Sequence, residues 1–320
     1  MIINTNPEFG VELTLVLPYA YWLHTQGKLE KVITSKGMKP FYYFCDDVEE
    51  RYDQRTVDNE AAGLNEIPNN WIYGSPIYAE LYKDEWPGWE FYANNKQGCG
   101  ILDYSQWKMP DFNTHFKNDK FVLDKPHIVI SNRYNWEHGH PPQGFFSVEC
   151  LYNIFNYLTE SGYVVIYKRP KNTEFPLDQN EIRTVLGKEE LTANVEGVGI
   201  INDFQLTKHF KDVYLFDDLV TQYPEYTYNE IQINFFVNAS GFISMGGGST
   251  LFPCFFQKPT ISYFSGTLIE ARRDWFWEDS EGNKNIKNYH FMINPDMIPF
   301  VDVGNNYVGF LDKIKEIWGK

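Results

Sequence analysis

Short apolar runs alternate with longer amphipathic stretches through most of the second half of the chain. The runs are rich in Val, Ile, Phe and Tyr and are bounded by Gly, Pro, Asn or Asp, which is typical of buried strands. They cover residues 127–131, 163–167, 198–203, 213–219, 242–245 and 260–264. Helices are predicted at residues 148–162, 181–190, 228–240 and 251–257. This alternation predicts an α/β fold with a parallel sheet covered on both faces, a Rossmann-like domain.

The helix after residue 147 carries the clearest end signals. Ser147 precedes the first apolar position, where its hydroxyl can cap the helix, and Glu149 lies in the first turn. Gly162 follows the last periodic residue and can adopt the left-handed conformation that commonly ends a helix. These signals predict a helix between the first two strands of this domain.

The first part of the chain is less regular. We predict a strand over residues 1–4, a largely buried helix over residues 12–24, and two short strands over residues 31–37 and 40–44. Residues 46–124 are rich in Trp, Tyr, Asn and Pro without a clear period, which is typical of a binding region.

Two domains are predicted, residues 1–125 and 126–320, because the regular alternation begins near residue 126. The sequence leaves open whether the last predicted helix, at about residues 305–318, packs back on the first domain.

Composition and charge exclude several kinds of function. The chain of 320 residues is 43% hydrophobic and 18% aromatic, as expected for a globular protein, and its formal net charge is −15. No Lys/Arg stripe offers a surface for nucleic acid, so an anionic ligand must be bound by helix N-termini and a few well-placed cations. The aromatic rings are expected chiefly in the core, with a surface that stacks on sugars as the alternative.

The four cysteines are scattered, without the spacing of a metal site, and are expected to be reduced. The start of the chain lacks the basic region of a signal peptide, and no apolar run approaches the ~20 residues of a membrane helix. We therefore expect a cytoplasmic protein with no membrane span and no metal site.

A glycine-rich turn stands between the strand at residues 242–245 and the next predicted helix. Its residues are Gly246, Gly247, Gly248, Ser249 and Thr250. Glycines let backbone N–H groups approach an anion closely, and the helix dipole adds partial positive charge, so the turn suits a phosphate or diphosphate. It matches neither the P-loop pattern nor GxGxxG, and a plain strand-to-helix turn is the alternative.

Cationic side chains follow two other strands of the same predicted sheet. Arg133 follows the strand at 127–131, and Lys168 with Arg169 follows the strand at 163–167. In a parallel sheet these positions share the carboxyl edge with the glycine-rich turn, and we expect them to bind the diphosphate, Arg169 foremost. Glu230, on the helix before the turn, is a candidate for a ribose hydroxyl, or else an exposed helix acid.

Residues 228–264 resemble the donor-binding half of the GT-B glycosyltransferases. In that family a helix leads into a short strand, a Gly/Ser/Thr turn and a helix whose N-terminus holds the nucleotide diphosphate; a Lys-Pro pair and a strand follow. Bacterial heptosyltransferases have a comparable arrangement, and fucosyltransferase-like enzymes have a Ser-rich turn. The resemblance implies two facing Rossmann-like domains, with residues 1–125 on the acceptor side and residues 126–320 binding the donor.

A second stretch, FGVELTLVLP at residues 9–18, resembles the heptosyltransferase segment that follows the first strand. By that match Glu12 falls on the acidic residue assigned as the catalytic base, with Glu8 as the alternative. A first-turn acid that complements the helix dipole is the structural alternative for Glu12. Heptosyltransferases have an Asp before the turn and a His in the next helix, where this chain has Gly246 and Leu251. These departures concern the donor and not the fold.

The resemblance implies a glycosyltransferase that moves a hexosyl or deoxyhexosyl group from a nucleotide diphosphate sugar to a glycan or other hydroxyl acceptor. The reaction is expected to be inverting and to need no metal or other cofactor. Nucleotide-sugar epimerases and polysaccharide pyruvyl transferases are the enzyme alternatives on this fold, and a non-catalytic carbohydrate-binding protein is the alternative from another class. The pairs Asp46–Asp47 and Asp217–Asp218 would instead fit the metal-binding acids of GT-A enzymes, although such pairs commonly form turns.

Overall fold

The computed structural model describes residues 1–56, 63, 110–134, 136–137, 142, 145–169, 184–185, 190–245, 252–253, 255–263, 300–302 and 307–319. Contacts divide the chain into two compact units. Described residues up to Pro110 belong to the first unit, and those from Asp111 onward belong to the second. The domain boundary predicted near residue 125 therefore falls inside the second unit.

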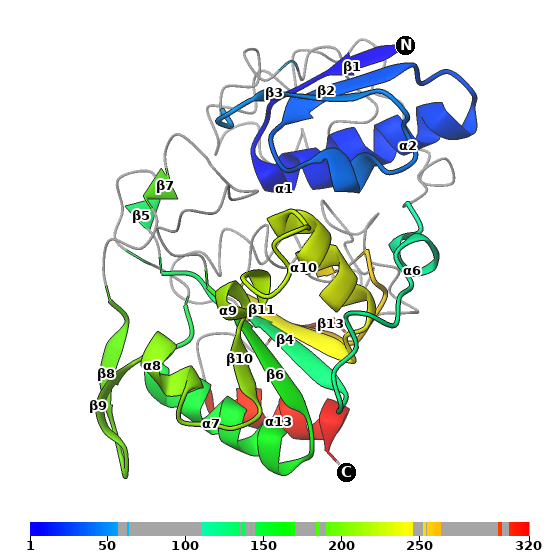
Figure 1. Cartoon of the computed structure of the whole chain (residues 1–320). Helices are drawn as coiled ribbons and strands as arrows, with labels where there is room; N and C mark the ends of the chain where they lie inside the picture. Colours follow the sequence, from blue (N-terminus) through cyan, green and yellow to red (C-terminus); the bar gives the residue numbers. More distant parts are fainter. Residues whose placement is uncertain are drawn as a thin grey trace, which may run out of the picture. The chain divides into compact units, whose positions relative to one another are not determined.

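The first unit contains a three-stranded parallel sheet in the order β1-β2-β3 (Figure 1). Its strands are β1 (Ile2–Asn4), β2 (Lys31–Ser35) and β3 (Val48–Tyr52). A helical run connects β1 to β2 and comprises α1 (Phe9–Val11), a π-helical stretch (Glu12–Val16) and α2 (Leu17–Thr25). The predicted first strand, helix and second strand are confirmed.

The strand predicted at residues 40–44 is wrong. Lys39–Tyr42 form a 3₁₀ helix instead, with Pro40 in its first turn. Proline lacks the N–H that a strand would donate and has the fixed φ that a helix start requires, so Pro40 favours the helical alternative. The strand of this region is β3, which the hydrophobic pattern did not predict because its sequence, VEERY, is mostly charged.

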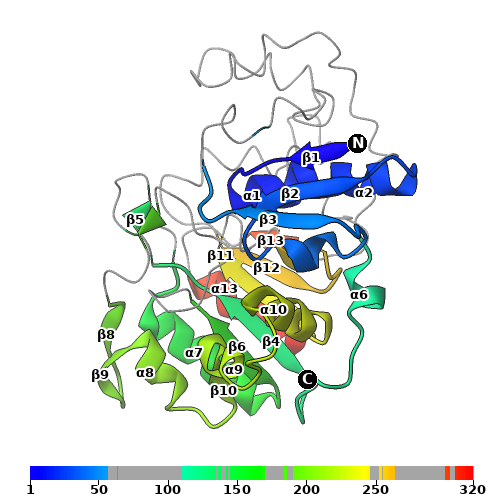
Figure 2. The same ribbon diagram turned by 45° about the horizontal axis from the view of Figure 1, so that its top comes forward.

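The second unit is built on a six-stranded parallel sheet in the order β10-β6-β4-β11-β12-β13 (Figure 2). The strands are β4 (His127–Ser131), β6 (Val164–Lys168), β10 (Val213–Leu215), β11 (Gly241–Met245), β12 (Thr260–Tyr263) and β13 (Phe300–Asp302). The predicted α/β fold with a parallel sheet is confirmed.

Two predicted elements of this unit are wrong in type or pairing. Residues 198–203 supply β9 (Gly199–Asn202), which pairs antiparallel with β8 (Thr192–Val195) and not with the main sheet. Within the helix predicted at residues 181–190, β7 (Thr184–Val185) is a strand that pairs antiparallel with β5 (Trp136–Glu137). At residues 198–203 the apolar run forms a local hairpin strand, and at residues 184–185 a short strand stands within an apparent helical period. The pattern of a single sequence does not specify which strands pair.

The side chains of the main sheet alternate between two faces. The face defined by Ile130, Val165 and Ile243 packs with α7 (Val148–Glu160), α8 (Asp203–Thr207) and α13 (Tyr307–Trp318) in one apolar core. We call it the α7 face. The opposite face packs against α10 (Tyr228–Val237), as the ring contact of Phe236 with Phe242 shows, and we call it the α10 face. A short helix, α9 (Phe216–Val220), follows β10.

The chain's last helix packs within the second unit, beside α7 (Figure 1). Phe310, Ile314 and Trp318 belong to the core of the α7 face. A Cβ atom at Gly241 would lie 2.5 Å from the Trp318 ring, so only glycine lets β11 begin under this tryptophan. The packing partner of this helix, which the sequence left open, is thus α7.

Both ends of α7 match their sequence signals. The Ser147 hydroxyl accepts a hydrogen bond from the Cys150 N–H at 3.2 Å, and Gly162 has a left-handed φ of 85°.

Among the helices that the structure describes, none is long and apolar enough to cross a lipid bilayer.

The buried histidine of β4 generates a prediction about pH. Burial lowers the pKa of His127 from 6.5 to about 4, and its Nε2 lies 2.9 Å from the Phe235 carbonyl oxygen. Between these pKa values the unfolded chain binds the proton more readily, so stability falls as the pH falls. From about pH 7.5 to about pH 5.5, wild type should lose about 1 kcal/mol more stability than His127→Gln in urea unfolding. An equal loss in both proteins would show that His127 does not titrate in this way.

Candidate functional site

The order of the main sheet defines a topological switch point. From β4 the chain builds outward through β6 and β10 on one side, and β11, β12 and β13 build outward on the other. Ligands of open parallel sheets bind outside the carboxyl ends of the strands where the order reverses, which here lies between β4 and β11. The register places Ser131 of β4 between Lys168 of β6 and Ser244 of β11.

Two of the predicted site segments follow the strands that flank this switch point. Asn132 and Arg133 come directly after β4, and the glycine-rich turn begins directly after Met245, the last residue of β11. Residues 246–250 themselves, and Leu251, lie outside the described residues, so their role as a phosphate-binding turn stays a prediction. Arg169 follows β6, one strand away from the switch point.

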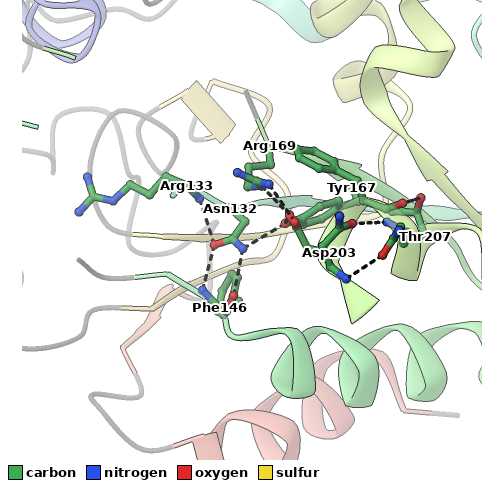
Figure 3. Close-up of polar contacts among 10 residues, drawn as sticks. Asn132, Arg133, Phe146, Tyr167, Arg169, Asp203 and Thr207 are labelled. Carbon is green, nitrogen blue, oxygen red and sulfur yellow. Dashed lines mark hydrogen bonds and ion pairs between the residues drawn. The ribbon is translucent and has the colours of Figure 1, made fainter. Parts of the chain in front are cut away.

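Arg169 is held in a buried network on the α7 face (Figure 3). Its Nε donates to Asp203 Oδ2 at 2.5 Å and its Nη2 donates to Asp203 Oδ1 at 2.8 Å, a bidentate ion pair. The guanidinium also stacks on the Phe204 ring, with 4.0 Å between Cζ and the ring centroid. Arg169 is 1% exposed and Asp203 is fully buried.

Two further side chains join Asp203 to the loop after β4. The Tyr167 hydroxyl donates to Asp203 Oδ2 at 2.6 Å, and Asn132 Nδ2 donates to the Tyr167 oxygen at 3.1 Å. Burial, and then the negative charge of Asp203, raise the pKa of Tyr167 well above 10, so the phenol stays protonated and keeps donating. Asn132 Oδ1 accepts from the backbone N–H groups of Phe146 and Arg133, which fixes the start of the loop.

One guanidinium nitrogen of this network has no hydrogen-bond partner among the described residues. Nη1 of Arg169 is buried and makes no hydrogen bond to the described part of the chain. A buried donor without a partner costs about 1–3 kcal/mol. Such a group calls for an explanation, and an acceptor oxygen such as that of a bound anion would satisfy it.

The side chains of Lys168 and Arg169 lie on opposite faces of the sheet, although the two residues are consecutive. Lys168 is 6% exposed on the α10 face, where its Nζ donates to Gln232 Oε1 and lies 5.5 Å from the centre of the Tyr228 ring. The two cations therefore flank the carboxyl edge from opposite faces, because successive side chains of an extended strand point in opposite directions.

The side chains of Arg133 and Glu230, the other two predicted donor-binding residues that the structure describes, lie outside the network around Arg169. Figure 3 shows the Arg133 side chain directed away from the Arg169–Asp203 pair. Glu230 caps α10, since its Oε2 accepts from the N–H of Thr227 at 2.7 Å and from the Thr227 hydroxyl at 2.8 Å. This capping box is sufficient reason for an acid at this position. The ribose contact proposed from the sequence stays a prediction.

In the first unit, Glu12 is fully buried at the start of the π-helical stretch. Its Oε1 accepts from the hydroxyls of Thr34 and Tyr42, and its Oε2 accepts from Nη1 of Arg55 at 2.5 Å. Burial, and then the charge of Glu12, raise the pKa of Tyr42 well above 10. Glu8 lies one turn earlier and is only partly buried, and its carbonyl oxygen accepts from the Glu12 N–H at 2.9 Å.

The structure thus brings Arg169 together with three residues that sequence reasoning missed: Asn132, Tyr167 and Asp203. Asp203 has the clearest signal, because it follows an apolar run and begins a helix capped by Asn202. Of the two aspartate pairs, Asp217 and Asp218 lie in the first turn of α9. No group of three or more potential metal-ligating side chains occurs in the part of the chain that the structure describes.

No protein-family model matches the chain, and no curated protein matches it. Among solved structures, it is similar to the E. coli ADP-heptose LPS heptosyltransferase II, with a TM-score of 0.50 and 9% identity over 99% of this chain and 98% of that one. It is also similar to E. coli heptosyltransferase WaaC, solved with ADP, with a TM-score of 0.47 and 9% identity over 98% of each chain. A UDP-GlcNAc 2-epimerase from Methanocaldococcus jannaschii gives a TM-score of 0.33 and 12% identity over 95% of this chain and 67% of that one.

The similarity to heptosyltransferase II spans nearly both chains and, together with the two parallel sheets, shows that the protein has the GT-B glycosyltransferase fold. At 9% identity the likeness establishes the fold alone, because one fold can carry many chemistries. The other two similarities are too weak to carry an argument.

The buried pair of Glu12 and Arg55 generates a prediction about stability. Glu12→Gln removes one charge of a buried ion pair, which should destabilise the protein by about 3 kcal/mol. Glu8→Gln, at the residue that precedes α1, is the control and should cost much less, because Glu8 is only partly buried. Urea unfolding of both variants measures the difference. Equal stabilities would contradict a structural role for Glu12.

Proposed function

We propose that the protein is a glycosyltransferase that moves a sugar from a nucleotide diphosphate sugar to a hydroxyl of a glycan or other acceptor. The observation that carries this proposal is the switch point between β4 and β11 in a GT-B fold, with Arg133 after one strand and the glycine-rich turn after the other. The name of the similar solved structure, the ADP-heptose LPS heptosyltransferase II, includes a nucleotide sugar, which supports a nucleotide-sugar donor.

The donor's diphosphate would bind at the carboxyl edge of the second unit. The N–H groups of Gly246, Gly247 and Gly248 and the hydroxyls of Ser249 and Thr250 would supply donors at the helix start that the sequence predicts. Arg133 and Lys168 add positive charge near this edge, and Arg169 adds an N–H donor, in a chain whose net charge is −15. Since the overall charge repels anions, these local groups must provide the attraction.

The proposed transfer is inverting and metal-independent, with a hexosyl or deoxyhexosyl group moved. A carboxylate takes the proton of the acceptor hydroxyl, and the fixed donors of the turn stabilise the departing diphosphate. Glu12 is fully buried and accepts hydrogen bonds from Thr34, Tyr42 and Arg55, so an acceptor hydroxyl would have to reach a buried carboxylate. Glu8 is less buried and is therefore the more accessible candidate for the base.

Nucleotide binding tests the proposal. In thermal unfolding with UDP, GDP, ADP, CMP or dTDP, one nucleoside diphosphate should raise the melting temperature equally with Mg²⁺ or with a chelator. At about 100 times its dissociation constant a ligand adds about 2.7 kcal/mol of stability. Gly247→Val should abolish the shift, because its side chain would block approach of the phosphate. Gly309→Ala is the matched control, since a Cβ there meets no atom within 4 Å.

Turnover of the matching nucleotide sugar separates the alternatives. A glycosyltransferase should release the nucleoside diphosphate faster when an acceptor is present, at the same rate with and without chelator. Conversion of the sugar without any acceptor would identify an epimerase. Loss of turnover with chelator would refute metal independence, and absence of any nucleotide shift would refute the proposal itself.

A further inference from the structure

We infer that Asp203 is a positioning residue, which holds Arg169 so that its Nη1 donates to a phosphate oxygen of the donor's diphosphate. This inference rests on the proposed function for the identity of the anion. It adds Asp203, which the sequence did not identify, to the candidate site. It also specifies that Nη1 is the atom of Arg169 that donates to the diphosphate.

Three consecutive residues immobilise the guanidinium. Asn202 caps α8 in a reciprocal capping box with Gln205, so the backbone at this point is fixed. Asp203 then binds two guanidinium nitrogens at 2.5 and 2.8 Å, and Phe204 covers one face of the group. One edge and one face of the planar group are therefore occupied by a single rigid segment.

The remaining edge carries Nη1. Because Asp203 engages Nε and Nη2, Nη1 is the nitrogen directed away from the carboxylate. It is buried and has no hydrogen-bond partner among the described residues. A purely structural ion pair gains nothing from keeping this donor unsatisfied, whereas a preorganised donor loses little entropy when an anion arrives.

The location fits the donor's diphosphate. Arg169 follows β6 at the carboxyl edge, and β6 is the neighbour of β4, one of the two strands that flank the switch point. Adjacent strands lie about 4.8 Å apart, so one strand spacing separates Arg169 from the loop after β4. Tyr167 and Asn132 connect Asp203 to that loop through hydrogen bonds of 2.6 and 3.1 Å.

The test measures affinity for inorganic pyrophosphate, and for the tightest-binding nucleoside diphosphate, by titration calorimetry. Arg169→Lys keeps a cation beside Asp203 but lacks Nη1, and it should lower affinity at least tenfold. Asp203→Asn should also lower affinity about tenfold, which is about 1.4 kcal/mol. Lys125→Gln controls for net charge, because Lys125 forms an exposed ion pair with Asp212 just before β4, and its affinity should equal that of wild type.

A double-mutant cycle separates positioning from a structural role. If Asp203 acts only through Arg169, the variant carrying both Arg169→Gln and Asp203→Asn should bind no more weakly than the single variant Arg169→Gln. This double variant replaces both partners of the pair by neutral groups, so it remains measurable if a single variant fails to fold. Tyr167→Phe removes one bond to Asp203 but leaves the bidentate pair, so it should lower stability while affinity changes less than twofold.

The outcomes for the inference and for the proposed function are distinct. Nucleotide binding that Arg169→Lys and Asp203→Asn leave unchanged would overturn the inference, even if both variants lose stability, and would leave the proposed function standing. Pyrophosphate binding that depends on both residues, with no affinity for any nucleotide, would support the anion site and refute the proposed function. Absence of binding to either probe in wild type would overturn both.

Discussion

Successive side chains of an extended strand point to opposite faces of a sheet, and this constraint organises the carboxyl edge of the second unit. Tyr167 and Arg169 face the core of α7 and α8, while Lys168 faces α10. The two sides of β6 therefore carry different chemistry. On one side a carboxylate neutralises the guanidinium, and on the other the ammonium meets an amide oxygen and an aromatic ring. A ligand lying on one side of this strand can engage only one of the two cations closely.

Each unit contains a buried carboxylate that is stabilised by the same two kinds of donor. Glu12 and Asp203 are fully buried, and each accepts from an arginine and from a buried tyrosine. A buried charge is tolerated only when it is paired and its other hydrogen-bonding positions are filled. The pairs differ in one respect: Asp203 binds its arginine through two nitrogens, whereas Arg55 divides Nη1 between Glu12 and the Pro7 carbonyl oxygen.

The parallel sheet of the second unit was predictable because its strands are buried on both faces and read as apolar runs. The same signal failed at β9, where Ile200 is 82% exposed in a hairpin, because an apolar residue can lie on a surface as well as in a core. The carboxyl-edge position of Arg169 also followed from the sequence. Its partner did not, because Asp203 lies 34 residues further on and their contact depends on tertiary packing. Glu12 shows the same limit, since Arg55 lies 43 residues away.

The departures from the heptosyltransferase pattern have an electrostatic consequence. Where those enzymes have an Asp before the turn, this chain has Gly246, which removes a negative charge beside the expected diphosphate. Asp203 adds a negative charge beside Arg169, at the carboxyl end of β6, but that charge is already compensated by the guanidinium it binds. The pair is therefore close to neutral as a unit and contributes mainly through the direction of its remaining N–H donors. In this arrangement, affinity for an anion depends on how rigidly those donors are held more than on net positive charge.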